Sequence, residues 1–169
     1  MEIQTERLCI RGLHTDDWAD MKNIFSDFSR SAYGVYDRPF PTKDDEIKAL
    51  VRQFVGSGLF FAVSPLGGDR MAGYVCFHRD GDRYDLGYCF HSAYQGKGYA
   101  YESVKALLVY MARAYPVSAF TAGTAMDNTP SRRLLEKLGF VCRSTEPISF
   151  DGTVSFLGGN FELPVGERG

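Results

Sequence analysis

The stretch of sequence that decides the fold reads Gln95-Gly96-Lys97-Gly98-Tyr99-Ala100. It lies between a run typical of a strand, residues 84–91, and an apolar stripe typical of a long helix, residues 100–115. Glycine lets the backbone approach a ligand closely, and a helix N-terminus presents unpaired N–H groups at the positive end of its dipole. The segment therefore predicts a phosphate-binding turn, with a plain strand-to-helix turn as the alternative.

Two common phosphate motifs do not match this segment. A Walker A loop requires Ser or Thr after Gly-Lys, and here Gly98 follows Lys97. The dinucleotide-binding fingerprint requires a third glycine where this chain has Tyr101. The six residues alone therefore do not identify the molecule to which the bound phosphate belongs.

The sequence on both sides of this segment predicts one α/β sheet. Apolar runs predict strands over residues 7–13, 59–64, 71–78, 84–91, 118–125, 140–150 and 153–163. Helical stripes lie after Thr15, after Pro41, over residues 100–115, and from Asn128 or Thr129 to Gly139. The predicted order is β-α-α-β-β-β-α-β-α-β-β, in a mixed, mostly antiparallel sheet.

Capping and turn signals give the expected boundaries. Thr15 is the predicted N-cap of the first helix, because acidic residues follow it in the first turn. Thr42 and Asp45 have the spacing of a capping box at the start of the second helix. Asp-Gly pairs at residues 80–81 and 151–152 predict the turns of two hairpins.

Length, charge and cysteine content restrict the class of protein. A chain of 169 residues fits one domain, residues 1–169. A formal net charge of −2 gives no reason to expect a nucleic acid or a membrane surface as partner. The cysteines Cys9, Cys76, Cys89 and Cys142 lack the spacing of metal ligands. We expect them to be small buried hydrophobes in a cytoplasmic protein that binds no metal.

Three blocks of sequence, in this order, resemble the GNAT acetyltransferase superfamily: Asp85-Leu86-Gly87-Tyr88-Cys89-Phe90, the segment Gln95 to Ala100, and Asn128-Thr129-Pro130-Ser131-Arg132-Arg133-Leu134-Leu135-Glu136-Lys137-Leu138-Gly139-Phe140. The family motif Q/R-x-x-G-x-G/A corresponds to Gln95, Gly98 and Ala100. The opening Thr5-Glu6-Arg7-Leu8-Cys9-Ile10-Arg11 resembles the branch that includes the Rim-type ribosomal-protein N-terminal acetyltransferases. The resemblance covers nearly the whole chain, and it implies a GNAT-like acyl-CoA N-acyltransferase fold with acetyl-CoA as co-substrate.

The resemblance also implies how coenzyme A binds. Backbone groups near residues 88–91 would pair with the pantetheine arm like an added strand, and N–H groups of residues 96–100 would hold the pyrophosphate. Asn128 would bond to the pantetheine arm, a role compatible with the alternative of a simple helix N-cap. The implied cofactor residues are Tyr88, Phe90, His91, Gln95, Gly96, Lys97, Gly98, Tyr99, Ala100, Asn128 and Ser131.

Acetylation of an amine needs a route for a proton from the amine and a donor to the leaving thiolate. By resemblance, Ser131 would hydrogen-bond the coenzyme A sulfur; alternatively it bonds to nearby backbone in the first helical turn. Many family members carry a Leu-Tyr pair on this helix, where this chain has Leu134-Leu135. Asp85 matches a position where several members carry a glutamate, and is the candidate base; a solvated strand-end carboxylate is the alternative. His91 is a weaker candidate for the base.

Recognition of the acceptor is assigned to residues 29–41, a loop that includes Tyr33, Tyr36 and Phe40. Packing of a lid is the alternative role of these rings. We therefore expect a monomeric or homodimeric N-acetyltransferase that acts on a protein N-terminus or a small-molecule amine. A regulatory module that binds acyl-CoA without turnover is the alternative, and the missing tyrosine favours it.

Overall fold

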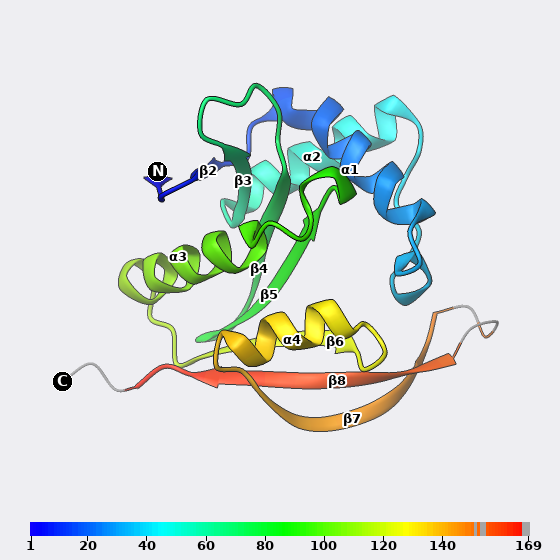
Figure 1. Ribbon diagram of the computed structural model, residues 1–169, viewed down its shortest axis with the longest axis vertical. Helices are drawn as coiled ribbons and strands as arrows, with labels where there is room; N and C mark the ends of the chain where they lie inside the picture. The colour runs from blue at the N-terminus through cyan, green and yellow to red at the C-terminus, as the bar shows by residue number, and fades with distance from the viewer. Residues whose placement is uncertain (151, 153–154, 167–169) are drawn as a thin grey trace.

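The computed structural model describes residues 1–150, 152 and 155–166, which fold around one eight-stranded sheet (Figure 1). The strand order is β1-β2-β3-β4-β5-β6-β8-β7. Neighbouring strands are antiparallel except for β5 and β6, which are parallel, so the expected mixed sheet is confirmed. The strands are β1 (Glu2–Gln4), β2 (Leu8–Gly12), β3 (Phe60–Pro65), β4 (Gly73–Asp80), β5 (Arg83–Phe90), β6 (Ala119–Ala125), β7 (Val141–Ser149) and β8 (Ser155–Pro164).

Helices cover both faces of the sheet. One core cluster joins α1 and α2 to one face, and a second cluster joins α3 and α4 to the other. The α-helices of the described chain are α1 (Trp18–Arg30), α2 (Asp44–Ser57), α3 (Tyr99–Ala114) and α4 (Thr129–Lys137). Short 3₁₀ turns precede α1, follow it and precede α3, at η1 (Thr15–Asp17), η2 (Gly34–Tyr36) and η3 (Ser92–Tyr94).

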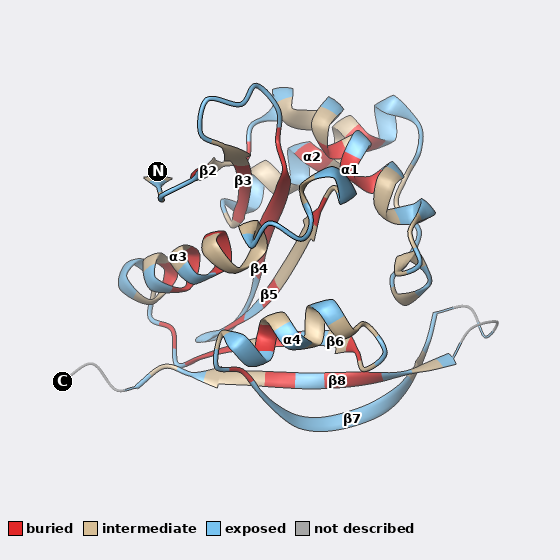
Figure 2. Cartoon of the chain, viewed as in Figure 1, coloured by how far each residue is buried: buried red, intermediate tan, exposed pale blue. Residues whose placement is uncertain are grey.

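Strand β4 explains why the sheet is covered on both sides. Successive side chains of a strand point to opposite faces. Tyr74 and Cys76 accordingly belong to the cluster under α1 and α2, and Val75 and Phe77 belong to the cluster under α3. Figure 2 shows the buried residues concentrated on the central strands and on the helix faces that meet them. A strand buried on both faces reads as a continuous apolar run, which is the pattern that predicted it.

The sequence prediction missed β1. This strand has three residues, pairs only with β2, and half-buries one side chain, Ile3, opposite Ile10. Three residues at a sheet edge give too short a pattern for a period-two signal. The observed order therefore has one strand more at its start than the predicted order.

The two predicted threonine caps are wrong. Thr15 lies inside η1, and the N–H of His14 donates to the Asp17 carboxylate at 2.7 Å. Thr42 lies outside α2, whose N-cap is Lys43 and has no side-chain capping bond. In the second helix the acids of residues 44–46 occupy the first turn, so favourable interaction with the helix dipole replaces the capping box.

The prediction for the cysteines is correct for Cys76 alone, which is buried. Cys9 and Cys89 are half-buried and Cys142 is exposed on β7, the edge strand of the sheet. The expected turn at residues 151–152 and the start of the last strand fall partly on Asp151 and Thr153, which lie outside the described residues.

Candidate active site

The strands β5 and β6 pair over a short distance and then separate. Their register joins Arg83 to Ala119, Tyr84 to Phe120 and Asp85 to Thr121. Beyond these pairs, residues 86–90 of β5 bond to β4 on one edge, and β6 does not pair with them on the other. An edge of this kind can accept an extended ligand as an additional strand.

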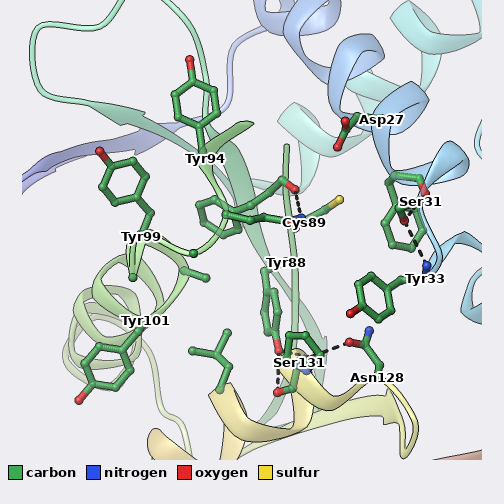
Figure 3. Close-up of a pocket in the computed structure, with 18 residues that line it drawn as sticks. Asp27, Ser31, Tyr33, Tyr88, Cys89, Tyr94, Tyr99, Tyr101, Asn128 and Ser131 are labelled. Carbon is green, nitrogen blue, oxygen red and sulfur yellow. Dashed lines mark hydrogen bonds between the residues drawn. The ribbon is translucent and has the colours of Figure 1, made fainter. Parts of the chain in front are cut away.

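A first cavity of about 330 Å³ lies at the open end of this split (Figure 3). It is lined from β5, the glycine segment, the first turn of α3 and the first turn of α4. The structure brings together nine of the predicted cofactor residues in its lining: Tyr88, Phe90, Gln95, Gly96, Gly98, Tyr99, Ala100, Asn128 and Ser131. Asp27, from α1, also lines it and was not predicted.

The glycine segment adopts the backbone that an anion site needs. Gly96 and Gly98 have φ of 72° and 78°, a region that residues with a Cβ avoid. Gly98 is the N-cap of α3 and offers no side-chain cap, so the first N–H groups of the helix face the cavity without a side-chain acceptor. The Gln95 side chain donates to the Phe90 carbonyl at 2.9 Å and ties this segment to the end of β5.

Arg7 holds the same segment from the other side. Its Nη1 donates to the Lys97 carbonyl at 2.7 Å, and its Nε donates to Glu102 Oε2 at 2.7 Å. Thr5 Oγ1 donates to Glu102 Oε1 at 2.6 Å. Burial tends to raise the pKa of Glu102, but the hydrogen bonds from Thr5 and Arg7 lower it overall, so this carboxylate stays ionised. The sequence signal was present in Thr5-Glu6-Arg7, which indicated only the branch of the family.

Two predicted cofactor residues do not line the first cavity. His91 Nδ1 accepts from the N–H of Ala93 at 3.1 Å, and its Nε2 lies 3.6 Å from Asp27 Oδ1. The ammonium of Lys97 lies 5.6 Å from the centroid of the Tyr94 ring. Their side chains are therefore engaged in fixing the turn between β5 and α3.

A second cavity, also of about 330 Å³, lies on the side of α1 and α2. Both Tyr33 and Tyr36, predicted to bind the acceptor, line it, and Phe40 of the same loop lines it too. The two cavities share Phe28, Tyr33, Tyr88, Asn128 and Ser131. They therefore meet at the start of α4, beside the split between β5 and β6.

A pair of hydroxyl groups lies at this junction. The Tyr88 hydroxyl is 2.7 Å from Ser131 Oγ, and the Ser131 N–H donates to Asn128 Oδ1 at 3.3 Å (Figure 3). Burial raises the pKa of Tyr88 to about 12, although the hydrogen bond with Ser131 lowers it. The phenol therefore stays protonated at neutral pH. The resemblance implied a role only for the backbone near Tyr88, and the position of its hydroxyl group was not predicted.

Neither residue of the Leu134-Leu135 pair brings a polar group to the junction. Leu134 lines the first cavity, and Leu135 is buried and lines the second. Asn128 does cap α4, as the sequence predicted, by accepting from the Ser131 N–H. The polar groups that Asn128 and Ser131 bring to the junction thus lie at the start of this helix.

Asp85 lies apart from the junction and lines neither of the two cavities. Its Oδ1 accepts from the Thr121 hydroxyl at 2.8 Å, across the parallel pairing of β5 and β6. Burial raises the pKa of Asp85, while the Thr121 hydrogen bond and the charge of His78 oppose the rise. His78 is paired with Asp85 in the sheet and does line the second cavity.

Residues 7–141 match the acetyltransferase (GNAT) domain family, over most of the length of the chain. The chain belongs to the GNAT acetyltransferase family. The glycine segment, the strand split and the first turn of α4 all lie within the matched residues. This GNAT protein is accordingly an acetyl-CoA-dependent N-acetyltransferase, and acetyl-CoA is its co-substrate.

Individual relatives agree with the family. The chain is 30% identical over 145 residues to YnaD, an uncharacterized N-acetyltransferase of Bacillus subtilis (strain 168), with 82% of each chain covered. It superposes on a GNAT-family acetyltransferase from Bacillus anthracis with a TM-score of 0.84 and 26% identity, covering 97% of this chain and 98% of that one. RimL, a ribosomal L7/L12 alpha-N-protein acetyltransferase in complex with coenzyme A, has the same fold, with a TM-score of 0.86, 16% identity and 98% of each chain covered.

The described residues form neither a metal-binding cluster nor a membrane-spanning helix. They contain no group of three or more His, Cys, Asp or Glu side chains that is able to hold a metal ion. None of their helices is both long enough and apolar enough to cross a membrane.

Proposed function

We propose that this GNAT enzyme, acting as one domain over residues 1–169, transfers the acetyl group directly to a primary amine of a small molecule or a protein N-terminus. The observation that carries the proposal is that two cavities meet at Tyr88, Asn128 and Ser131. One cavity has the features of a coenzyme A site, and the other opens to the loop between α1 and α2. A donor and an acceptor that enter from the two sides would meet beside the hydroxyl pair.

The residues of the first cavity fit coenzyme A. The open N–H groups at the start of α3 suit a pyrophosphate, and the unpaired edge of β5 suits the amides of a pantetheine arm. Acetyl-CoA, when bound, supplies the thioester carbon that the amine attacks and the sulfur that leaves. Asn128 is positioned to orient the arm, although its amide oxygen also accepts from Ser131.

Protons need a route on both sides of the reaction. Ser131 Oγ is the donor that we assign to the leaving sulfur, and the protonated Tyr88 hydroxyl can return a proton to it across 2.7 Å. Asp85 is the base that we assign to the amine. Because it lines neither cavity, its proton would travel through a water or through His78.

One observation favours the second candidate function, an acyl-CoA-binding module without turnover. The apolar Leu134 and Leu135 occupy the helix positions where many family members carry a Leu-Tyr pair. Incubation with labelled acetyl-CoA and a panel of amines and N-terminal peptides separates the two. We expect a labelled product and stoichiometric release of coenzyme A. Tight binding of coenzyme A with no acetylation across the panel would instead support the module.

A further inference from the structure

We infer that the second cavity takes a small primary amine carried on an aromatic or other apolar group, in preference to a protein N-terminus. The inference rests on the proposed transfer to an amine and names the class of acceptor. Its basis is the chemistry of the walls of the cavity, its closure at the front, and the single carboxylate at its rim.

The walls are aromatic and held in place by their own contacts. Phe54 stacks on Phe60 with ring centroids 3.9 Å apart, and Phe40 stacks on Phe25 at 4.2 Å. Phe40, Phe54 and Phe60 all line the cavity, together with Phe28 and Tyr74. A ring or branched apolar group of a ligand gains by leaving water for such a surface and can stack on its faces. A polar peptide backbone would lose hydrogen bonds to water wherever it lies against these rings.

The front of the cavity is bridged. Tyr36, from η2, packs against Phe156 of β8 at 5.1 Å, edge to face. The guanidinium of Arg38 lies 5.7 Å from the centroid of the Phe150 ring, at the end of β7. Figure 1 shows the segment between α1 and α2 on the side of the molecule where β7 ends and β8 begins. A peptide acceptor needs open space for the residues that follow its first, and these contacts restrict the space beside Tyr36 and Asp37.

The size of the second cavity is also consistent with a small acceptor. Its volume of about 330 Å³ is near the lower end of the range for sites that bind small molecules. Such a space accepts one ring-sized group with its amine directed toward Tyr88 and Ser131.

The charge at the rim of the second cavity also favours some acceptors over others. Asp37 is the one Asp, Glu, Lys or Arg among the described residues that line the cavity, and no ion pair to it occurs in the described part of the chain. Burial, followed by the charges of Asp27 and Asp37, raises the pKa of Cys89 to about 12, so the field of the Asp37 carboxylate reaches the interior beside the cavity. An ammonium is attracted to this rim, and a ligand with its own carboxylate is repelled.

The first test compares three acceptors. 2-Phenylethylamine carries the ring and the amine, phenylalanine adds a carboxylate, and a seryl hexapeptide presents a peptide N-terminus. We expect kcat/KM for 2-phenylethylamine to exceed that for each of the others by about tenfold or more. A preference for the hexapeptide, or equal rates with phenylalanine, would overturn the inference.

The second test removes the rim charge and the bridge. Asp37→Asn should raise KM for 2-phenylethylamine about two- to fivefold, with unchanged affinity for coenzyme A, because an exposed charge contributes modestly. Asp69→Asn, which makes the same charge change in the exposed turn between β3 and β4, is the matched control and should leave KM unchanged. Tyr36→Ala should raise kcat/KM for the hexapeptide relative to kcat/KM for 2-phenylethylamine. Identical behaviour of the two Asp variants would remove Asp37 from acceptor recognition.

Calorimetric titration of 2-phenylethylamine into the complex of the protein with coenzyme A distinguishes failure of the cavity assignment from failure of the proposed function. Binding that Asp37→Asn weakens, without acetylation of any amine, would support the cavity assignment and contradict the proposed function. Acetylation of other amines, with no binding of 2-phenylethylamine, would contradict the cavity assignment and leave the proposed function standing.

Discussion

The hydroxyl groups of Tyr88 and Ser131 lie where the two cavities meet, and they set the expectations for single residues. Ser131→Ala removes the proposed donor to the leaving sulfur and should lower kcat by about 100-fold. Tyr88→Phe keeps the ring in the cavity wall and removes only the hydroxyl, so it should lower kcat less. The dissociation constant of coenzyme A, measured by calorimetry, should stay within about twofold of the wild-type value for both variants, because neither hydroxyl reaches the phosphate site.

The outcome for these variants discriminates between two roles of Ser131. A wild-type kcat for Ser131→Ala would leave the serine as a first-turn residue of α4 and remove it from the mechanism. An equal loss of kcat and of coenzyme A affinity would point to a damaged cavity.

Asp85 gives a second expectation, which depends on pH. A base must be ionised, so activity should fall as the pH drops through its pKa, which burial raises above the ordinary value of 3.8. In the wild type the acid limb of the kcat/KM profile should therefore lie above pH 3.8. Asp85→Asn should abolish this limb and lower the plateau by about 100-fold.

Asp82→Asn, at the exposed turn before β5, is a suitable control for that profile. It should keep both the limb and the plateau. An unchanged acid limb in Asp85→Asn would show that the carboxylate serves only to hold Thr121 and thereby β5 against β6.

At the scale of the elements, the turn from β5 into α3 is fixed on two sides, by Gln95 and by Arg7. Gly98→Val should weaken the affinity for acetyl-CoA by about tenfold or more, because the residue needs a positive φ that valine avoids. A Cβ at this position would also lie 3.3 Å from Arg7 Nη2. Gly12→Val, on β2 with ordinary φ and open space, is the control, and thermal unfolding of both variants checks that they fold.

The contact between Arg7 and Glu102 carries an expectation of its own, because it links the segment before β2 to α3. Arg7→Met should raise KM for acetyl-CoA several-fold, by about three- to tenfold, with kcat unchanged, since the arginine fixes the Lys97 carbonyl and touches no reacting group. Glu102→Gln should give the same change, and the double variant should be no worse than either single one. Arg70→Met, which breaks the exposed pair with Asp20, should leave KM as it is. Additive effects would mean that the two residues act separately.

Across the whole molecule, the features predicted from the sequence are those that local patterns encode. Three such features are Gly96 and Gly98, the Asn128 cap and the apolar run of β4. Each depends on residues only a few positions apart in the chain, so it can be recognised without a structure. The Tyr88–Ser131 pair joins positions 43 residues apart, and the contact of Tyr36 with Phe156 joins the loop after α1 to the last strand. These contacts arise only when the sheet forms, which is why the acceptor side of the site was not predicted in the same detail.

The pairing of Arg11 with Asp17 shows how the same tertiary contacts govern stability. Two hydrogen bonds of 2.8 Å join the guanidinium to the carboxylate, and the His14 N–H donates to it as well. Burial tends to raise the pKa of Asp17, but these bonds lower it below the ordinary value of 3.8 overall. A carboxyl group with a lowered pKa in the folded state stabilises the fold above its unfolded pKa, and the contribution is lost as the pH falls through the folded pKa.

Asp17→Asn should therefore lower the free energy of unfolding at pH 7 by about 1–3 kcal/mol, the usual contribution of hydrogen bonds to a charged group. The difference from the wild type should shrink as the pH falls below 3.8, because the carboxyl of the unfolded wild type is protonated there and that of the folded state follows at its lower pKa. Urea denaturation at pH 7 and near pH 3 measures both values, with Asp16→Asn, an exposed neighbour, as the control. A difference of the same size at both pH values would mean that the charge of Asp17 does not contribute, and that its hydrogen bonds alone fix η1 to β2.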